Sequence, residues 1–322
     1  MMKTTKNPGA WLGLKRTSND HHVFTIVAFD QRGSYTQMLP EGTSYETAVA
    51  IKEDVIDALS PLASAILLDP DYGLSPAQRL HRTCGLLMAL EQTGYSGDST
   101  YRHTELYPDW SVAQIKRMGA SAVKLLVYYN PNAGELAEEI EALSRQVSEQ
   151  CLAQDIAYFL EPVTYSTDRN VPKSSMAFAQ RRPELICETA RRLGATGPDV
   201  LKLEFPIDGN FDDDQAHWLK ACEAVSAAAP VPWVLLSAGV EFPVFEQQVK
   251  IACQGGASGF LGGRAIWKES VPMSESDRRD YLANLGVKRL KKLIEISNAF
   301  ARPWTDFYQA TPARQHWFAD YR

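Results

Sequence analysis

Two lysines lie in the middle of otherwise apolar segments of this chain. Lys202 lies in DVLKLEFP (residues 199–206), and Lys124 lies in AVKLLVYY (residues 122–129). Lysine is almost never fully buried without a partner. Alternate side chains of a β-strand face opposite sides, so Lys202 and Glu204 would share one face while the leucines occupy the other. The same alternation predicts that Lys124 faces inward, on a nearby strand.

Two inward lysines suggest amine chemistry. Burial and a nearby like charge both lower a lysine pKa, so we expect the pKa values of Lys202 and Lys124 to be depressed. A neutral amine is a nucleophile, and its natural electrophile is a carbonyl group. Lys202 is therefore the candidate nucleophile. A structural alternative is that Lys202 reaches out of the strand end or forms an ion pair with Glu204.

Polar residues also end the other apolar segments. They are Asp30, Gln31 and Arg32 after VFTIVAF, Asp69 in SAILLDP, Glu161 in AYFLEPVTY, Ser237 in VPWVLLSAG and Arg264 in GFLGGRAIW. Each alone is typical of a turn, a cap or an ion pair. Their recurrence at the same end of successive segments indicates one active site.

The elements that must position these residues alternate along the chain. Seven clear apolar segments and a weaker one, GLLMALEQTG, are expected to be strands, and amphipathic helices separate them. Between residues 134 and 153, for example, Leu136, Ile140, Leu143 and Val147 recur on one helical face. Alternating strands and helices indicate parallel strands with right-handed crossovers. Eight such units favour a closed (β/α)8 TIM barrel with eight parallel strands.

The barrel is expected to form a single domain over residues 1–322. Residues 1–22 would cap the barrel, and residues 275–322 would form a C-terminal helical segment. The main alternative is an open doubly wound sheet, which usually carries G-x-G-x-x-G after its first strand. Here the first strand is followed by FDQRGSY, and no P-loop is present.

The last two strand ends are candidates for a phosphate site, because TIM barrels often bind phosphate after strands seven and eight. They carry Ser237, Ala238 and Gly239 in one segment, and Gly262, Gly263 and Arg264 in the other. Glycine lets backbone N–H groups approach an anion, and arginine adds a forked charged donor. The alternative is that these glycines serve only tight turns.

Composition excludes several classes of protein. The chain has 322 residues, 45% of them hydrophobic, with a formal net charge of -6. It therefore lacks the basic footprint of a nucleic-acid-binding protein. No apolar stretch is long enough for a membrane span or a signal peptide. Five cysteines without a CxxC favour free thiols in a reducing compartment, so we expect a cytoplasmic protein without nucleic-acid or membrane partners.

Several longer motifs occur in order between residues 28 and 267: AFDQRG, SPLASAILLDPDYGL, AVKLLVYY, FLEPVTY, DVLKLEFP, PWVLLSAGV and GASGFLGGRAIW. In this combination the chain resembles the class I tagatose-1,6-bisphosphate aldolases and the related 6-deoxy-6-sulfofructose-1-phosphate aldolases. The resemblance implies an aldehyde-lyase that reversibly cleaves tagatose 1,6-bisphosphate to dihydroxyacetone phosphate and glyceraldehyde 3-phosphate. It implies a Schiff base, no cofactor or metal, and a homo-oligomer, either a dimer or a tetramer.

The resemblance also implies residue roles. Lys202 would form the Schiff base, and Glu161 would transfer protons at the cleaving bond, with Asp30 and Lys124 nearby. Ser237, Gly239, Gly263 and Arg264 would hold the C1 phosphate, and Gln31 and Arg32 would face the distal end of the substrate. The expected substrate-binding set also includes Asp69, Ala238 and Gly262, which lie at the ends of the same predicted strands.

Other functions stay open at this point. LLDPDYGL is nearer to the tagatose enzymes, but GASGFLGGRAIW is nearer to the sulfosugar enzymes, whose products are dihydroxyacetone phosphate and 3-sulfolactaldehyde. A Mg²⁺-dependent lyase could use carboxylates such as Asp30, Asp69, Glu161 or Glu204. A non-catalytic sugar-phosphate binder would need Arg264 but not Lys202. A zinc enzyme is disfavoured because the six histidines form no HExxH motif.

Overall fold

Eight parallel strands form a closed barrel in the computed structural model, which describes residues 3–319 and residue 321. The predicted TIM barrel is therefore confirmed, including the weaker strand segment. The barrel order is β10-β11-β2-β3-β4-β7-β8-β9. Its strands are β2 (Phe24–Phe29), β3 (Ala65–Leu68), β4 (Gly85–Ala89), β7 (Ala122–Tyr129), β8 (Ala157–Thr164), β9 (Val200–Leu203), β10 (Trp233–Leu236) and β11 (Gly259–Gly262).

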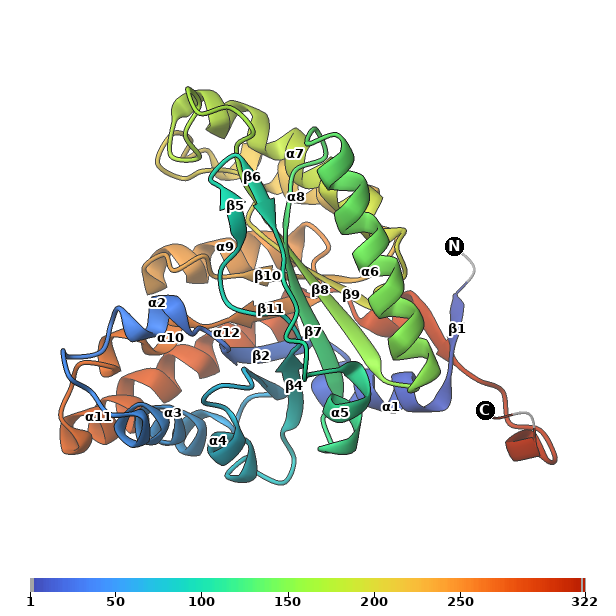
Figure 1. Ribbon diagram of the computed structural model, residues 1–322, viewed down its shortest axis with the longest axis horizontal. Coiled ribbons are helices and arrows are strands. Elements are labelled where there is room, and N and C mark those ends of the chain that lie inside the picture. The colour runs from blue at the N-terminus through green and yellow to red at the C-terminus, as the bar shows by residue number, and fades with distance from the viewer. Residues whose placement is uncertain (1–2, 320, 322) are drawn as a thin grey trace.

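Helices surround the barrel (Figure 1). The longer ones are α1 (Pro8–Thr17), α3 (Tyr45–Leu59), α6 (Glu135–Ala153), α7 (Met176–Gly194), α8 (Gln215–Ala228), α9 (Phe242–Gln254) and α12 (Val287–Phe300). The shorter ones are α2 (Gly33–Thr36), α4 (Leu74–Gln78), α5 (Val112–Arg117), α10 (Arg264–Trp267) and α11 (Glu275–Tyr281). A π-helical turn, Leu282–Gly286, joins α11 to α12, and 3-10 turns cover Lys268–Ser270, Trp304–Asp306 and Trp317–Ala319. None of the described helices is long and apolar enough to cross a membrane.

The amino ends of the barrel strands are covered by α1 and by the segment around Trp304. Helix α1 packs against β4, β7 and β8, and Trp11 in this helix meets buried Trp304 edge-on at 4.7 Å. Strand β1 (Thr4–Lys6) pairs in parallel with β12 (Tyr308–Ala310), and the two lie side by side at one edge of the molecule (Figure 1). Because these amino ends are covered, an open site is expected at the carboxyl ends of the barrel strands.

A two-stranded antiparallel hairpin, β5 (Ser96–Asp98) and β6 (Tyr101–His103), follows β4.

Alternation along the strands separates two apolar clusters. The inner cluster fills the barrel with residues such as Phe24, Ile26 and Phe159, whereas the outer cluster joins the strands to the helices. Leu201 and Leu203 belong to the outer cluster, as their positions in the sequence predicted. The side chains between such residues therefore point into the barrel, and this alternation brings both strand lysines inside.

Candidate active site

A cavity of about 590 Å³ opens at the carboxyl ends of the barrel strands. Most of the predicted site residues line it: Asp30, Gln31, Arg32, Lys124, Glu161, Lys202, Ser237, Ala238, Gly263 and Arg264. Asp69, Gly239 and Gly262 lie outside this lining. The structure thus brings together residues from β2, β7, β8, β9, β10 and β11, although these residues are distant in the sequence.

Lys202 projects from β9 toward a carboxylate. Its side chain is only 3% exposed, and its Nζ lies 2.8 Å from Glu161 Oε2. Glu161 is itself buried, on the neighbouring strand β8. Glu204 forms ion pairs with Lys173 and Arg182 instead, so the alternative ion pair between Lys202 and Glu204 does not form. This arrangement places a potential nucleophile in direct contact with a group that can accept its proton.

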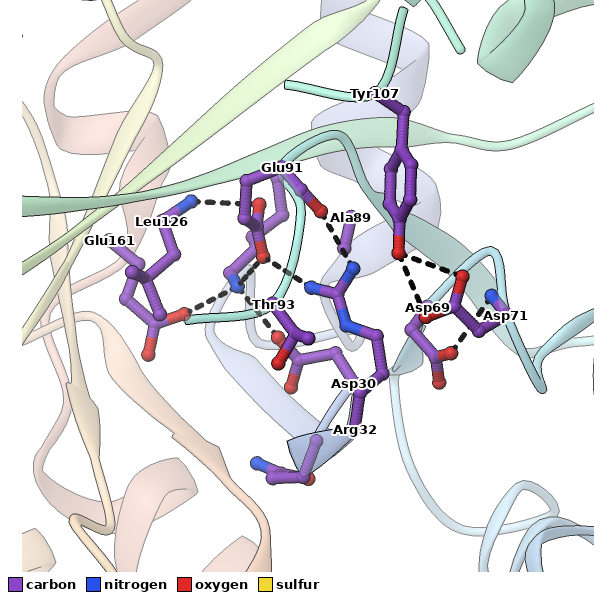
Figure 2. Close-up of polar contacts among 12 residues, drawn as sticks. Asp30, Arg32, Asp69, Asp71, Ala89, Glu91, Thr93, Tyr107, Leu126 and Glu161 are labelled. Atoms are coloured by element: carbon purple, nitrogen blue, oxygen red, sulfur yellow. Dashed lines mark hydrogen bonds and ion pairs between the residues drawn. The ribbon is translucent and has the colours of Figure 1, made fainter. Parts of the chain in front are cut away.

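Lys124 is fully buried among three carboxylates. Its Nζ lies 2.6 Å from Asp30 Oδ2, 2.8 Å from Glu91 Oε1 and 2.9 Å from Glu161 Oε2. In Figure 2 the carboxylates of Asp30, Glu91 and Glu161 point toward a common centre. Glu161 Oε2 therefore lies between the amines of Lys124 and Lys202.

The charges of this cluster correct one sequence-based expectation. Burial by itself lowers the pKa of Lys124, but Asp30, Glu161 and Glu91 outweigh it and hold the pKa well above its ordinary value. The expected depression was therefore wrong for this lysine. Burial likewise raises the pKa of Asp30, but the lysines Lys124 and Lys202 outweigh it and keep the pKa well below its usual range. Lys124 thus stays a cation and Asp30 an anion near neutral pH.

We expect Lys124→Met to lose about 3–5 kcal/mol of stability at pH 7, because it leaves buried carboxylates without their shared cation. The wild-type contribution of Asp30 is present above its unfolded pKa of about 3.9 and is lost as pH falls below it. In the variant, crowded carboxylates bind protons more readily in the folded state than in the unfolded state. Stability of the variant should therefore rise as pH falls from 7 to 5.

Denaturant unfolding at both pH values checks this prediction. A variant whose stability stays constant or falls between pH 7 and pH 5 would contradict it. Wild-type protein, measured in parallel, corrects for titration elsewhere in the chain.

Glu91 is a site residue that the sequence analysis missed. It follows β4, is buried, and accepts a hydrogen bond from Leu126 N at 2.9 Å. Arg32 donates to it twice, through Nη2 to Oε1 at 3.1 Å and through Nη1 to the carbonyl oxygen at 2.7 Å (Figure 2). Arg32, predicted to face the distal end of the substrate, is therefore largely committed to Glu91. The signal for Glu91 was a polar residue at a strand end, but its strand was the least distinct of the eight.

Asp69 does not reach the cavity, contrary to its predicted substrate-binding role. It is fully buried, forms an ion pair with Lys52, and accepts N–H bonds from Asp71 at 3.0 Å and Tyr72 at 2.9 Å. Lys52, from α3, needs a counter-ion because it is also fully buried. Asp69 is thus occupied by protein partners.

The predicted phosphate segments meet at one side of the cavity. Ser237 Oγ accepts a hydrogen bond from Gly263 N at 3.3 Å. Gly239 has φ +80, and a Cβ there would lie only 3.0 Å from Arg264 Cζ, so glycine lets the guanidinium lie against the backbone. Gly262 was expected in the same group, but a Cβ there would meet Phe245 at 2.6 Å. Gly262 therefore faces the helical layer, where close packing explains it.

Three further charged residues line the cavity beyond Lys202. Glu204 Oε1 lies 2.6 Å from Lys173 Nζ and 3.6 Å from Arg182 Nη2. Its Oε2 accepts hydrogen bonds from Thr164 N at 2.8 Å and Thr164 Oγ1 at 2.6 Å. Burial raises the pKa of Glu204, but the cations outweigh it and lower the pKa to about 2. Glu204 therefore stays ionised and is a poor proton acceptor near neutral pH.

The carboxylates of the cavity do not fit a Mg²⁺ site. Asp30, Glu91 and Glu161 converge on a point that the ammonium group of Lys124 already occupies. Within residues 3–319 and 321, no group of three His, Cys, Asp or Glu side chains is arranged to hold a metal ion. These three carboxylates thus bind the ammonium group of Lys124 rather than a metal ion from solution.

Comparisons with known proteins show which proteins this chain is similar to. A family model described as DeoC/LacD family aldolase matches residues 24–269. Tagatose 1,6-diphosphate aldolase 1 of Streptococcus pyogenes serotype M1 is 34% identical over 309 residues, covering 88% of this chain and 94% of the relative. The enzyme of the same name from Streptococcus mutans serotype c is 30% identical over 318 residues, covering 91% and 97%. Tagatose 1,6-diphosphate aldolase of Staphylococcus aureus strain Newman is 33% identical over 314 residues, covering 90% and 96%.

Solved structures share the fold at lower sequence identity. An archaeal fructose 1,6-bisphosphate aldolase superposes with a TM-score of 0.60 at 16% identity, covering 89% of this chain and 98% of that one. Fructose-bisphosphate aldolase from Slackia heliotrinireducens superposes with a TM-score of 0.64 at 15% identity, covering 94% and 91%. These likenesses establish the same barrel architecture.

Proposed function

The chain belongs to the DeoC/LacD family of aldolases, and we propose that it cleaves tagatose 1,6-bisphosphate reversibly through a Schiff base on Lys202. The products would be dihydroxyacetone phosphate and glyceraldehyde 3-phosphate. One observation carries the Schiff-base assignment: Lys202 Nζ is almost fully buried and lies 2.8 Å from Glu161 Oε2 inside the cavity. The substrate assignment is supported by the three similar relatives named for tagatose 1,6-diphosphate.

Formation of the covalent intermediate begins with Lys202 as a nucleophile. Glu161 can accept the proton of the Lys202 ammonium group across their 2.8 Å contact. The neutral amine then adds to the C2 carbonyl of the ketose to give a carbinolamine. Glu161 returns the proton to the departing hydroxyl, which leaves as water, so that an iminium ion forms and Glu161 is again a carboxylate. Lys124, which remains protonated 2.9 Å from the same Glu161 oxygen, can donate a hydrogen bond to neighbouring substrate oxygens without losing its proton.

Cleavage of the carbon–carbon bond uses the iminium nitrogen as an electron sink. Glu161 removes the proton from the C4 hydroxyl, the C3–C4 bond breaks, and its electrons move toward nitrogen to give an enamine. The aldehyde leaves. Protonation of the enamine at C3 and hydrolysis then release dihydroxyacetone phosphate and restore Lys202. Asp30 Oδ1, buried at the cavity without a hydrogen-bond partner, can accept a bond from a substrate hydroxyl.

The C1 phosphate is proposed to bind between Ser237 and Arg264. We expect Arg264→Ala to raise the concentration of dihydroxyacetone phosphate needed for half-maximal imine formation by about 10–100-fold. This factor corresponds to the loss of charged hydrogen bonds worth about 1.5–3 kcal/mol. Borohydride trapping at increasing ketone concentrations measures this. Arg264→Lys should retain part of the affinity, since it keeps the charge but not the forked geometry. If the half-saturating concentration of dihydroxyacetone phosphate is the same in Arg264→Ala as in the wild type, the phosphate does not bind on this side of the cavity.

A cleavage assay tests the whole function. Tagatose 1,6-bisphosphate, fructose 1,6-bisphosphate and 6-deoxy-6-sulfofructose 1-phosphate are offered side by side, with release of dihydroxyacetone phosphate as the readout. Cleavage of the tagatose ester with the highest kcat/KM is the expected result, and EDTA should leave the rate unchanged. A higher kcat/KM for 6-deoxy-6-sulfofructose 1-phosphate would show that the proposed substrate is wrong, but it would be consistent with the Schiff-base mechanism. Inactivation by the chelator, reversed by Mg²⁺, would reject the Schiff-base assignment.

The cytoplasmic location and the homo-oligomeric state are further parts of this proposal. All five cysteines are free thiols, which is typical of a reducing compartment. The oligomeric state follows from the family resemblance, and sedimentation of the purified protein measures it.

A further inference from the structure

Lys52 is a buried cation outside the cavity, and it contacts the chain on both sides of a proposed site residue. It comes from α3 and is fully buried. Its Nζ donates to the carbonyl oxygen of Phe29 at 2.7 Å and to that of Gln31 at 3.1 Å. These two carbonyls flank Asp30. The remaining partner of Lys52 is the Asp69 carboxylate.

The surroundings of Lys52 hold it in one place. The rings of Phe29, Tyr35 and Tyr72 have their centroids 4.5, 5.1 and 5.4 Å from Nζ. Burial lowers the pKa of Lys52, and Asp69 opposes that shift. A lysine with hydrogen bonds, a counter-ion and aromatic walls on several sides has little freedom to move.

We infer that Lys52 is a positioning residue for the aldolase reaction, which holds the turn 29–31 so that Asp30 meets Lys124. Asp30 Oδ2 lies 2.6 Å from Lys124 Nζ, and Lys124 Nζ lies 2.9 Å from Glu161 Oε2. A shift of the turn therefore moves the cluster that sets the position of Glu161. Misplacement of a catalytic group by about 1 Å can cost about 10²-fold in rate. The inference rests on the proposed Schiff-base function.

Asp69 extends the same support to the next strand end. Its carboxylate accepts hydrogen bonds from the backbone N–H groups of Asp71 and Tyr72. The Asp71 carboxylate in turn accepts a hydrogen bond from the Tyr107 hydroxyl at 2.8 Å (Figure 2). The turns after β2 and β3 are thus joined through one buried ion pair. Asp69 was predicted to bind the substrate, but its contacts with Lys52, Asp71 and Tyr72 give it this supporting role.

The test replaces the ion pair by neutral side chains. Lys52→Met combined with Asp69→Asn removes both charges and leaves no lone buried ion. We expect kcat to fall by about 10–100-fold with little change in KM, because the phosphate-binding residues are untouched. Trapping of dihydroxyacetone phosphate on Lys202 should still go to completion, because Lys202 is retained and imine formation can use a proton acceptor from solvent.

The same helix offers a matched control. Asp54, also on α3 and also buried, pairs with buried Arg278 at 2.7 Å and with exposed Arg279 at 2.8 Å. Neither arginine lines the cavity. Arg278→Met combined with Asp54→Asn removes a comparable ion pair. This control should lose stability in thermal unfolding but keep the wild-type kcat. If the Lys52 double variant does not fold, Asp69→Asn alone is compared with Asp54→Asn, and a larger fall in kcat is expected for Asp69→Asn.

The outcomes separate this inference from the function on which it rests. Wild-type kcat in the Lys52 double variant would overturn the positioning role, as would an equal loss of kcat in the Asp54 control. In the single-variant comparison, equal kcat values would overturn it. Failure of wild-type protein to form any trapped adduct would instead reject the Schiff-base function itself.

Discussion

Lys202→Met is expected to abolish cleavage, lowering kcat/KM by more than about 10⁴-fold, the upper end of what a single general base contributes. The covalent route disappears with the amine, and neither Lys124 nor Glu161 can replace it. Lys124 is held as a cation by three carboxylates, so it is a poor nucleophile. Methionine has a similar length and suits a side chain that is 3% exposed, so the barrel should remain folded.

Borohydride reduction in the presence of dihydroxyacetone phosphate, followed by peptide mass analysis, gives the direct readout. Wild-type protein should carry one adduct, on Lys202, and Lys202→Met should carry none. Lys173→Met is the matched control, because Lys173 also lines the cavity but is bound to Glu204. That variant should still form the adduct on Lys202. An adduct on another cavity lysine, or full activity in Lys202→Met, would contradict the proposed mechanism.

Glu161→Gln should lower kcat by about 10²–10⁴-fold, the usual contribution of a general base. The amide keeps the shape of the side chain but cannot accept the proton of the C4 hydroxyl. Asp30 and Glu91 still compensate Lys124, so we expect the variant to fold. Imine formation should slow less than cleavage, because it can use a proton acceptor from solvent.

Rapid-quench kinetics distinguish the two steps for this variant. With tagatose 1,6-bisphosphate, a trapped adduct of the whole ketose should accumulate, because its carbon–carbon bond no longer breaks quickly. Glu204→Gln is the comparison, since Glu204 lines the same cavity but has a pKa near 2 and contacts other cations. It should lose less activity. Unchanged cleavage in Glu161→Gln would assign the base to a different group.

The sequence alone determined the fold and the direction of the main side chains. Eight apolar segments separated by amphipathic helices predicted a closed parallel barrel, and the barrel forms. Alternation placed Leu201 and Leu203 on the outside and Lys202 on the inside, as observed. These features depend on the local periodicity of strands and on burial, and a single chain segment carries both signals.

Only the tertiary structure decided which charges became partners. Lys52 reaches Asp69 from a helix, and Arg32 bonds to Glu91. Lys124 contacts one carboxylate after β2, one after β4 and one within β8. Pairing of this kind depends on which residues the closed barrel brings within about 3 Å, and no local pattern records it. The pKa of Lys124 rises for the same reason: burial is visible in one strand, but the carboxylates that outweigh it come from positions as far apart in the chain as Asp30 and Glu161.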